Sequence, residues 1–278
     1  MKRVSFFSAL ALAAGVACAD LPQGVVLRFS CDEFRNSGPA TTLPDVTGSN
    51  NTGRVTGVRW AAGGRMGAAC EFTGKNSFIQ VPEVPALSGG RVTLCAWFKA
   101  PRAEGADRTL FDKDAANGYA LGLGGGNRRG RQGRLSFTVC GHECQSDTNL
   151  ADNVWHHVAA AYDGENLKLY VDGQLQKQVT AWHGEIPANG KDLTIGMNRS
   201  SPAPKEKEVA FEGLLDEIVL FSRGLGEEDV KSVIASTKPK FTKQQVERRL
   251  AELKDLFDRG LILQDFYDRK VKECEVGQ

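Results

Sequence analysis

Residues 153–174 read NVWHHVAAAYDGENLKLYVDGQ, and this stretch decides the fold class. It contains two runs rich in β-branched, aromatic and aliphatic residues, at 154–162 and 167–171, and these predict two β-strands. Asp163-Gly164 ends the first run. Asp172-Gly173 ends the second, and such a pair favours a type I′ turn because both central residues of that turn need positive φ. The stretch therefore predicts an antiparallel β-meander.

Similar strand patterns continue on both sides of this meander. Short apolar or alternating runs occur at residues 25–29, 67–74, 78–81, 91–99, 109–113, 119–123, 134–139, 193–196 and 211–221. Turn-rich segments separate them, and residues 35–57 are especially rich in Gly, Asn, Ser, Thr and Pro. This spacing is typical of an antiparallel β-sandwich.

Three motifs of the central stretch carry a family resemblance. WHHVA at 155–159, YDG at 162–164 and LYVDG at 169–173 resemble the central motifs of laminin-G-like, or concanavalin-A-like, jelly-roll domains. FEGLLDE at 211–217 resembles the closing strand of that family, and the SRGLGEE that follows resembles its final short helix. The resemblance implies a mainly β, antiparallel jelly-roll sandwich over residues 24–236.

The N-terminus has the pattern of an export signal. Lys2 and Arg3 precede a short apolar run at 4–16, and Ala17-Cys18-Ala19 fits a small-residue cleavage site. We expect residues 1–19 to be a cleaved signal peptide, which would place the protein in the periplasm, on the cell surface or outside the cell. The alternative is a lipoprotein anchored through Cys18. The run is too short for a membrane-spanning helix, and no other candidate span is present.

The C-terminal segment changes in composition. After a linker at 237–240, residues 241–278 show a helical period, with Gly260 placed to end the first helix. LAELKDLFDRGLILQDFYDRK at 250–270 is similar to the SHOCT module, a small helical hairpin, although Leu263 and Phe266 depart from its pattern. The resemblance implies a role in self-association.

The chain has 7 cysteines, one of which is Cys18. In an exported protein the others suggest disulfides, and the pairs we predict are Cys31–Cys70 and the local Cys140–Cys144. Other pairings stay open, because sequence alone does not determine connectivity.

No catalytic motif stands out in the sequence. Glu212, Asp216 and Glu217 are the nearest group of carboxylates, but their spacing differs from that of jelly-roll glycosidases, so we predict no catalytic residues. CGHEC at 140–144 could in principle hold zinc, but only one such cluster is present and a structural zinc site needs four ligands, so a local disulfide is the preferred interpretation.

Calcium is the cofactor that the family resemblance implies, in a structural role. The positions that match the usual ligands are Asp32 after the first strand, Asp45 in the Asn- and Gly-rich loop, and Asp216 in the closing strand. The alternatives are that Asp45 only starts a turn and that Asp216 only accepts backbone hydrogen bonds.

Five residues are candidates for ligand binding. Trp182 and His183 lie between strands, where an aromatic ring beside a polar group could contact a sugar. Arg128, Arg129 and Arg131 crowd one Gly-rich loop, which is either a solvated hairpin tip or a surface for an anionic polysaccharide.

The formal net charge of +1 gives no indication of nucleic-acid binding. We predict a non-catalytic exported protein that binds carbohydrate or an extracellular partner through the sandwich and associates through its helical tail. The alternatives are a glycan-active enzyme of jelly-roll fold and a structural envelope protein without a small ligand.

Overall fold

The computed structural model describes residues 21–32, 41–102, 105, 107–125, 130–181, 183–199, 209–237, 243–264, 266–268 and 271. The predicted signal peptide at 1–19, its Cys18, and Cys274 lie outside these residues. Among the helices of the described residues, none combines the length and the apolar character that a membrane crossing needs.

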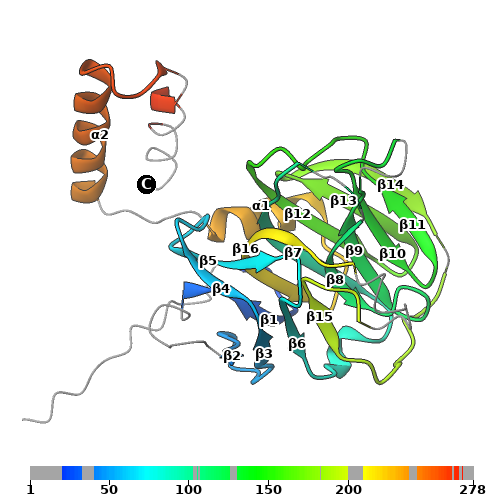
Figure 1. The fold of residues 1–278 in the computed structure, drawn as a ribbon. Helices are drawn as coiled ribbons and strands as arrows, with labels where there is room; N and C mark the ends of the chain where they lie inside the picture. The colour runs from blue at the N-terminus through cyan, green and yellow to red at the C-terminus, as the bar shows by residue number, and fades with distance from the viewer. Residues whose placement is uncertain are drawn as a thin grey trace, which may run out of the picture.

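Two antiparallel sheets face each other (Figure 1). Sheet A has the order β14 (Gln174–Thr180), β13 (Asn166–Val171), β12 (Trp155–Tyr162), β7 (Val92–Lys99), β16 (Glu212–Phe221), β5 (Ala68–Thr73) and β4 (Arg59–Ala62), and β1 (Val25–Phe29) also pairs with β16. Sheet B has the order β11 (His142–Gln145), β10 (Leu135–Val139), β9 (Tyr119–Leu123), β8 (Arg108–Lys113), β15 (Leu193–Ile195), β6 (Phe78–Val81), β3 (Gly53–Thr56) and β2 (Thr42–Leu43). The predicted mainly β jelly-roll sandwich is confirmed.

The central meander forms as the sequence predicts. β12 pairs with β13 and β13 with β14, and the turn between the last two consists of Asp172 and Gly173. Their φ angles are 51° and 85°, so both central residues have the positive φ of a type I′ turn. β12 also pairs along its whole length with β7, which connects the meander to the centre of sheet A.

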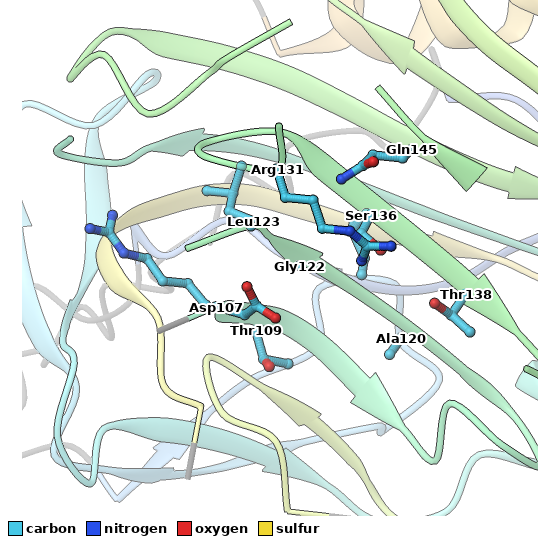
Figure 2. Close-up of a pocket in the computed structure, with 12 residues that line it drawn as sticks. Asp107, Thr109, Ala120, Gly122, Leu123, Arg131, Ser136, Thr138 and Gln145 are labelled. Carbon is cyan, nitrogen blue, oxygen red and sulfur yellow. The ribbon is translucent and has the colours of Figure 1, made fainter. Parts of the chain in front are cut away.

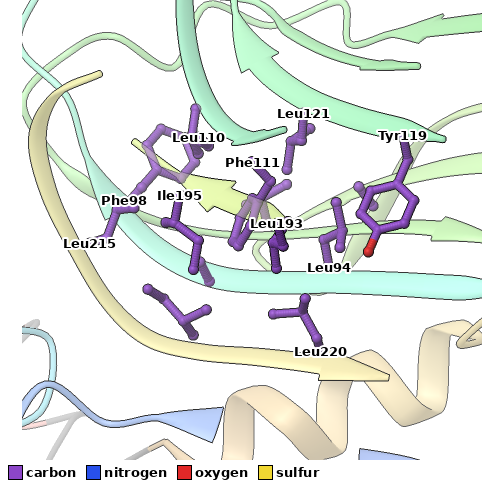
Figure 3. Packing of buried hydrophobic residues seen from close by; sticks show 14 of the residues in the cluster. Leu94, Phe98, Leu110, Phe111, Tyr119, Leu121, Leu193, Ile195, Leu215 and Leu220 are labelled. Carbon is purple, nitrogen blue, oxygen red and sulfur yellow. The ribbon is translucent and has the colours of Figure 1, made fainter. Parts of the chain in front are cut away.

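The main hydrophobic core lies between the two sheets (Figure 3). Leu94 and Phe98 of β7 meet Phe111 of β8 and Leu121 of β9, and all four are fully buried. Burial of each such side chain is worth about 1.5–3 kcal/mol. Because strand side chains alternate between faces, the same strands present their other residues outward.

The outer face of sheet A is covered by helix α1 (Glu227–Ser236), whose Val230 and Val233 are buried against it. Cys95 of β7 lies in this second apolar cluster, as expected for a cysteine in the middle of a strand. Beyond the cluster, Trp97 donates a hydrogen bond from Nε1 to Thr237 Oγ1 at 2.8 Å. The end of α1 is thereby attached to the sheet.

Strand β16 contains a bulge at its acidic pair. Glu217 has a φ of 47°, and the pairing of β16 with β7 shifts between Asp216 and Val219. The bulge directs the Glu217 side chain to Arg28 of β1, whose Nη2 lies 2.8 Å from Glu217 Oε2. The two side chains are 0% and 6% exposed, so this is a buried ion pair. It fixes β1 to the closing strand.

Several strands were not expected from the sequence. β2 and β3 lie within the turn-rich stretch 35–57, and they are held by pairing with each other and with β6. Such short strands carry too little local pattern to be predicted, because their partners are distant in the chain.

The last strand of the meander, β14, lies at the edge of sheet A, and most of its side chains are exposed.

The C-terminal segment forms helix α2 (Lys243–Asp258), followed by a turn in which Gly260 has a φ of 69°. Leu253 is buried against Leu250, Ile262 and Tyr267, and the rings of Phe257 and Tyr267 stack with centroids 4.9 Å apart. The predicted helical tail and its stop at Gly260 are therefore present. The resemblance to SHOCT stays a prediction.

Candidate functional site

A row of polar side chains crosses the outer face of sheet B. In β9 and β10 every second residue is buried, so Ala120, Gly122, Ser136 and Thr138 face outward. Strand register places Ser136 beside both Gly122 and Gln145. The sheet therefore gathers, from separate strands, hydroxyl and amide groups over a floor of very small residues.

These residues line a pocket of about 120 Å³ (Figure 2). Its floor is open because Gly122 has no side chain, and a Cβ there would come within 2.6 Å of the Arg108 carbonyl oxygen. The walls carry Thr109, Ser136, Thr138 and Gln145, which together offer several hydrogen-bond donors and acceptors. The described lining contains no aromatic ring, so recognition here would depend on hydrogen bonds.

An ion pair stands at one wall of the pocket. Arg131, from the turn between β9 and β10, donates from Nη1 and Nη2 to the two carboxylate oxygens of Glu143 on β11, each at 2.8 Å. Ser136 Oγ donates to Glu143 Oε1 at 2.5 Å. This bidentate pair is about one-third exposed, at 33% and 34%, and its planar geometry is the most specific that arginine and a carboxylate form.

A second carboxylate lies across the floor. Asp107 precedes β8 and accepts a hydrogen bond from the Gly125 backbone N–H at 2.8 Å. Figure 2 shows Gly122 between Asp107 and Arg131, with the Asp107 carboxylate close to Thr109. The pocket thus has a carboxylate on one side and Arg131, paired with Glu143, on the other. Arg108 also belongs to the lining, and its guanidinium donates to the carbonyl oxygens of Pro101 and Arg102.

Of the five predicted ligand residues, the structure places Arg131 in the pocket. His183 lies elsewhere, with a largely exposed ring whose Nε2 is 3.7 Å from Glu165 Oε1. Trp182, Arg128 and Arg129 lie outside the described residues. Sequence reasoning missed Thr109, Ser136, Thr138 and Gln145, whose only local sign was a polar residue at alternate positions of a strand.

The predicted calcium ligands are only partly brought together. Asp32 Oδ1 accepts the Ala68 N–H at 2.9 Å, and Asp216 Oδ2 accepts the Met66 N–H at 2.9 Å, so both carboxylates meet the same turn. Burial raises the pKa of Asp216 to about 8, and the nearby Glu217 and Asp32 carboxylates act in the same direction. Asp216 is fully buried and Asp32 is half-buried, and two carboxylates at one turn are a donor set that a cation would stabilise.

Asp45 does not belong to that pair. Its Oδ1 accepts the N–H groups of Arg28 and Thr47, and its Oδ2 accepts the N–H of Asn51. The carboxylate therefore organises its own loop beside β1, which was the alternative explanation for this residue. Within the described part of the chain, no group of three His, Cys, Asp or Glu side chains is arranged to hold a metal ion.

The three carboxylates of β16 have different environments. Glu212 is exposed at the start of the strand, whereas Asp216 and Glu217 are fully buried. Asp216 accepts backbone N–H groups and Glu217 pairs with Arg28. These interactions give Asp216 and Glu217 structural roles in the packing of β16.

The cysteine predictions have different outcomes. Cys31 and Cys70 are fully buried thiols whose sulfur atoms are 2.7 Å apart, so the structure brings the predicted pair together. Cys140 instead occupies the turn between β10 and β11, while Cys144 lies opposite Phe137 with its side chain in the core. All four thiols are free in the structure, but the extended strand between Cys140 and Cys144 separates these two along the hairpin, so the structure does not bring the second predicted pair together.

Comparison with known families agrees with this architecture. Residues 73–231 match the family described as the concanavalin A-like lectin/glucanases superfamily (Laminin_G_3). The chain belongs to this family. A search of curated proteins gave no match.

Solved structures share the laminin-G-like fold of this chain at low sequence identity. One is domain 4 of AbnA, a GH43 extracellular arabinanase from Geobacillus stearothermophilus, in complex with arabinotriose: identity is 20%, the TM-score is 0.57, and the match covers 76% of this chain and 98% of that domain. Another is the binding domain of Paraclostridial Mosquitocidal Protein 1, with 17% identity and a TM-score of 0.58. The match covers 78% of this chain and 53% of that chain.

A third is botulinum neurotoxin type C, whose cell entry depends on interaction with two ganglioside molecules. Identity is 14% and the TM-score is 0.54, and the match covers 78% of this chain and 52% of that chain. The laminin-G-like chain thus spans about half the length of the two toxin structures. At these identities the likeness shows the fold alone.

Proposed function

We propose that this laminin-G-like sandwich binds a carbohydrate without catalysing a reaction, and that the pocket over β8 to β11 is its binding site. The observation that carries the proposal is the row of hydroxyl and amide groups over the glycine and alanine floor. A sugar presents many hydroxyls, each both donor and acceptor, and such a wall can match them.

The comparisons support a binding role. The AbnA domain is solved with arabinotriose, and the toxin of similar fold interacts with gangliosides. Because one fold hosts many functions, the proposal depends on the pocket and not on the fold alone. An enzymatic role would need two carboxylates facing a substrate, whereas among the described lining residues Asp107 is the one carboxylate, and the neighbouring Glu143 is engaged by Arg131.

The test is a glycan panel, first with the unmodified chain and then with pocket variants. Ala120→Gln should fill the floor and abolish binding, since Ala120 faces outward in the pocket beside Thr138. Thr138→Val should weaken binding about fivefold to tenfold, because a hydrogen bond is worth about 1 kcal/mol net.

Thr180→Val on β14 makes the same chemical change away from the pocket and should leave the affinity unchanged. If both pocket variants bind as the unmodified chain does, the site lies elsewhere. If the chain binds no glycan on the panel, the carbohydrate proposal is rejected, and a protein partner becomes the better hypothesis.

We also propose a structural calcium ion, held by Asp32 and Asp216. The supporting observation is the closeness of these two carboxylates at one turn, where a cation would offset the cost of burying them. Calcium at 100 times its Kd should raise the free energy of unfolding by about 2.7 kcal/mol. The melting temperature should therefore be higher in excess calcium than in a chelator. Asp216→Asn should remove the difference, and equal melting temperatures in calcium and chelator would exclude the site.

The tail is proposed to support self-association. Leu261 and Leu263 are largely exposed in the turn after α2, at 59% and 81%, so apolar surface is available there. Removing residues 241–278 should lower the oligomeric state measured by light scattering while glycan binding is retained. If the full chain and the truncated chain assemble with the same number of copies per particle, this role is contradicted.

A further inference from the structure

Glu143 controls the charge that the pocket presents. Its carboxylate accepts hydrogen bonds from both Nη atoms of Arg131 and from Ser136 Oγ. Arginine has no acceptor and cannot lose its proton in a protein, so its guanidinium would otherwise be a ready partner for any anionic group. Glu143 occupies the face of Arg131 that would bind a carboxylate.

We infer that Glu143 is a specificity-determining residue, which makes this pocket select neutral saccharides over those that carry a uronic acid. The inference rests on the proposed carbohydrate function and deepens it. A sugar carboxylate that approached the Nη1–Nη2 edge of Arg131 would have to displace Glu143 and would meet its negative charge. Asp107, on the other side of Gly122, adds a second negative charge at the same pocket.

The geometry makes this competition direct. Both Nη atoms of Arg131 lie 2.8 Å from Glu143 oxygens, which is the bidentate arrangement that a uronate carboxylate would also require. The two ligands cannot occupy it together. A neutral sugar has no such need, because it can use Thr109, Ser136, Thr138 and Gln145 while the ion pair stays closed.

The reversal of this preference is the decisive experiment. Glu143→Gln keeps the size of the side chain but removes its charge and places an amide against the guanidinium, so Arg131 becomes available. The probes are β-1,4-galactan, β-1,4-glucan and mannan, together with any further neutral glycan that the panel identifies. Each is paired with the same material oxidised from a primary alcohol to a carboxylate, and affinities are measured by isothermal titration calorimetry.

For the unmodified chain we expect binding to a neutral glycan and at least tenfold weaker binding to its oxidised form. Glu143→Gln should change the ratio of the two affinities by about tenfold in favour of the oxidised form, and added salt should reduce this gain. The double variant Arg131→Gln with Glu143→Gln should lose the gain, because the exposed guanidinium is then absent.

A matched control changes the net charge by the same amount at a distance. Asp258 on α2 lies 2.8 Å from Lys254 in an exposed pair, and Asp258→Asn should leave the ratio of affinities unchanged. If Glu143→Gln behaves like Asp258→Asn while neutral binding persists, the role of Glu143 is overturned and the carbohydrate function stands. If the unmodified chain binds neither form of any pair, both proposals fail.

Discussion

Cys31 and Cys70 offer the sharpest test of how this fold is stabilised. We predict that they form a disulfide when the chain folds in the presence of a disulfide oxidant such as oxidised glutathione, which is reduced to two thiols as the protein bond forms. Their sulfur atoms are 2.7 Å apart, and the residues are 39 positions apart in the sequence. The bond would close a loop that carries β2 and β3 of sheet B and β4 of sheet A.

The expected stabilisation follows from the length of that loop. For about 39 residues the chain-entropy relation gives about 4 kcal/mol at 25 °C, and native disulfides typically contribute about 2–4 kcal/mol. For a sandwich of this size each kcal/mol shifts the melting temperature by about 2–4 °C. The oxidised chain should therefore melt about 4–16 °C above the reduced chain.

The assay compares chain refolded from denaturant with and without reductant, because the buried thiols are shielded in the folded state. Peptide mapping without reduction should find a Cys31–Cys70 peptide, and calorimetry should give the two melting temperatures. Cys70→Ser should melt at one temperature in both conditions. Cys95→Ala removes another buried thiol and should keep the full response to reductant. Equal melting temperatures for the unmodified chain, with no bridged peptide, would refute the reasoning.

Two further predictions concern charged groups. Arg28→Met should lower the free energy of unfolding by about 3–5 kcal/mol in chemical denaturation, because it removes a cationic partner of the buried Glu217 carboxylate. Adding Glu217→Met should recover part of the loss, and additive effects of the two changes would contradict a coupled pair. Hydrogen bonding and charge from Asp172, and then from Asp152, raise the pKa of His156. Protonated His156 therefore stabilises the fold fully below its ordinary pKa of about 6.5, and this contribution is lost as pH rises through the raised pKa. Melting temperatures of the unmodified chain and His156→Gln should converge as pH rises across that range, and a constant difference would rule out this titration.

The fold could be predicted because its decisive information is local. Asp172-Gly173 determines a turn by backbone geometry alone, and the alternation along 119–123 and 134–139 identifies which residues are buried. The long strand β16 was visible for the same reason. By contrast, β2 and β3 are strands only because β6 lies beside them. Their pairing depends on contacts that no short window of sequence contains.

The site was less predictable for a related reason. Arg131 was identified from a cluster of arginines, but its partner Glu143 lies on β11, and their ion pair could not be foreseen from either interpretation of the loop, a solvated hairpin tip or a surface for an anionic polysaccharide. Ser136 and Thr138 carry no distinctive motif and become a wall only when the sheet aligns their strands. Asp45 matched a ligand position by sequence, yet its carboxylate is engaged by three N–H groups of its own surroundings.

The edge strand β14 has a consequence for how many copies of this chain behave together. Its exposed side chains include Gln174, Lys177 and Gln178, and they occur on both faces of the strand. A strand from another molecule that added to this edge would have to remove water from the Lys177 ammonium, and the large apolar side chain exposed on β14 is that of Leu175. The hydration of Lys177 therefore opposes the joining of neighbouring sheets into a continuous fibre.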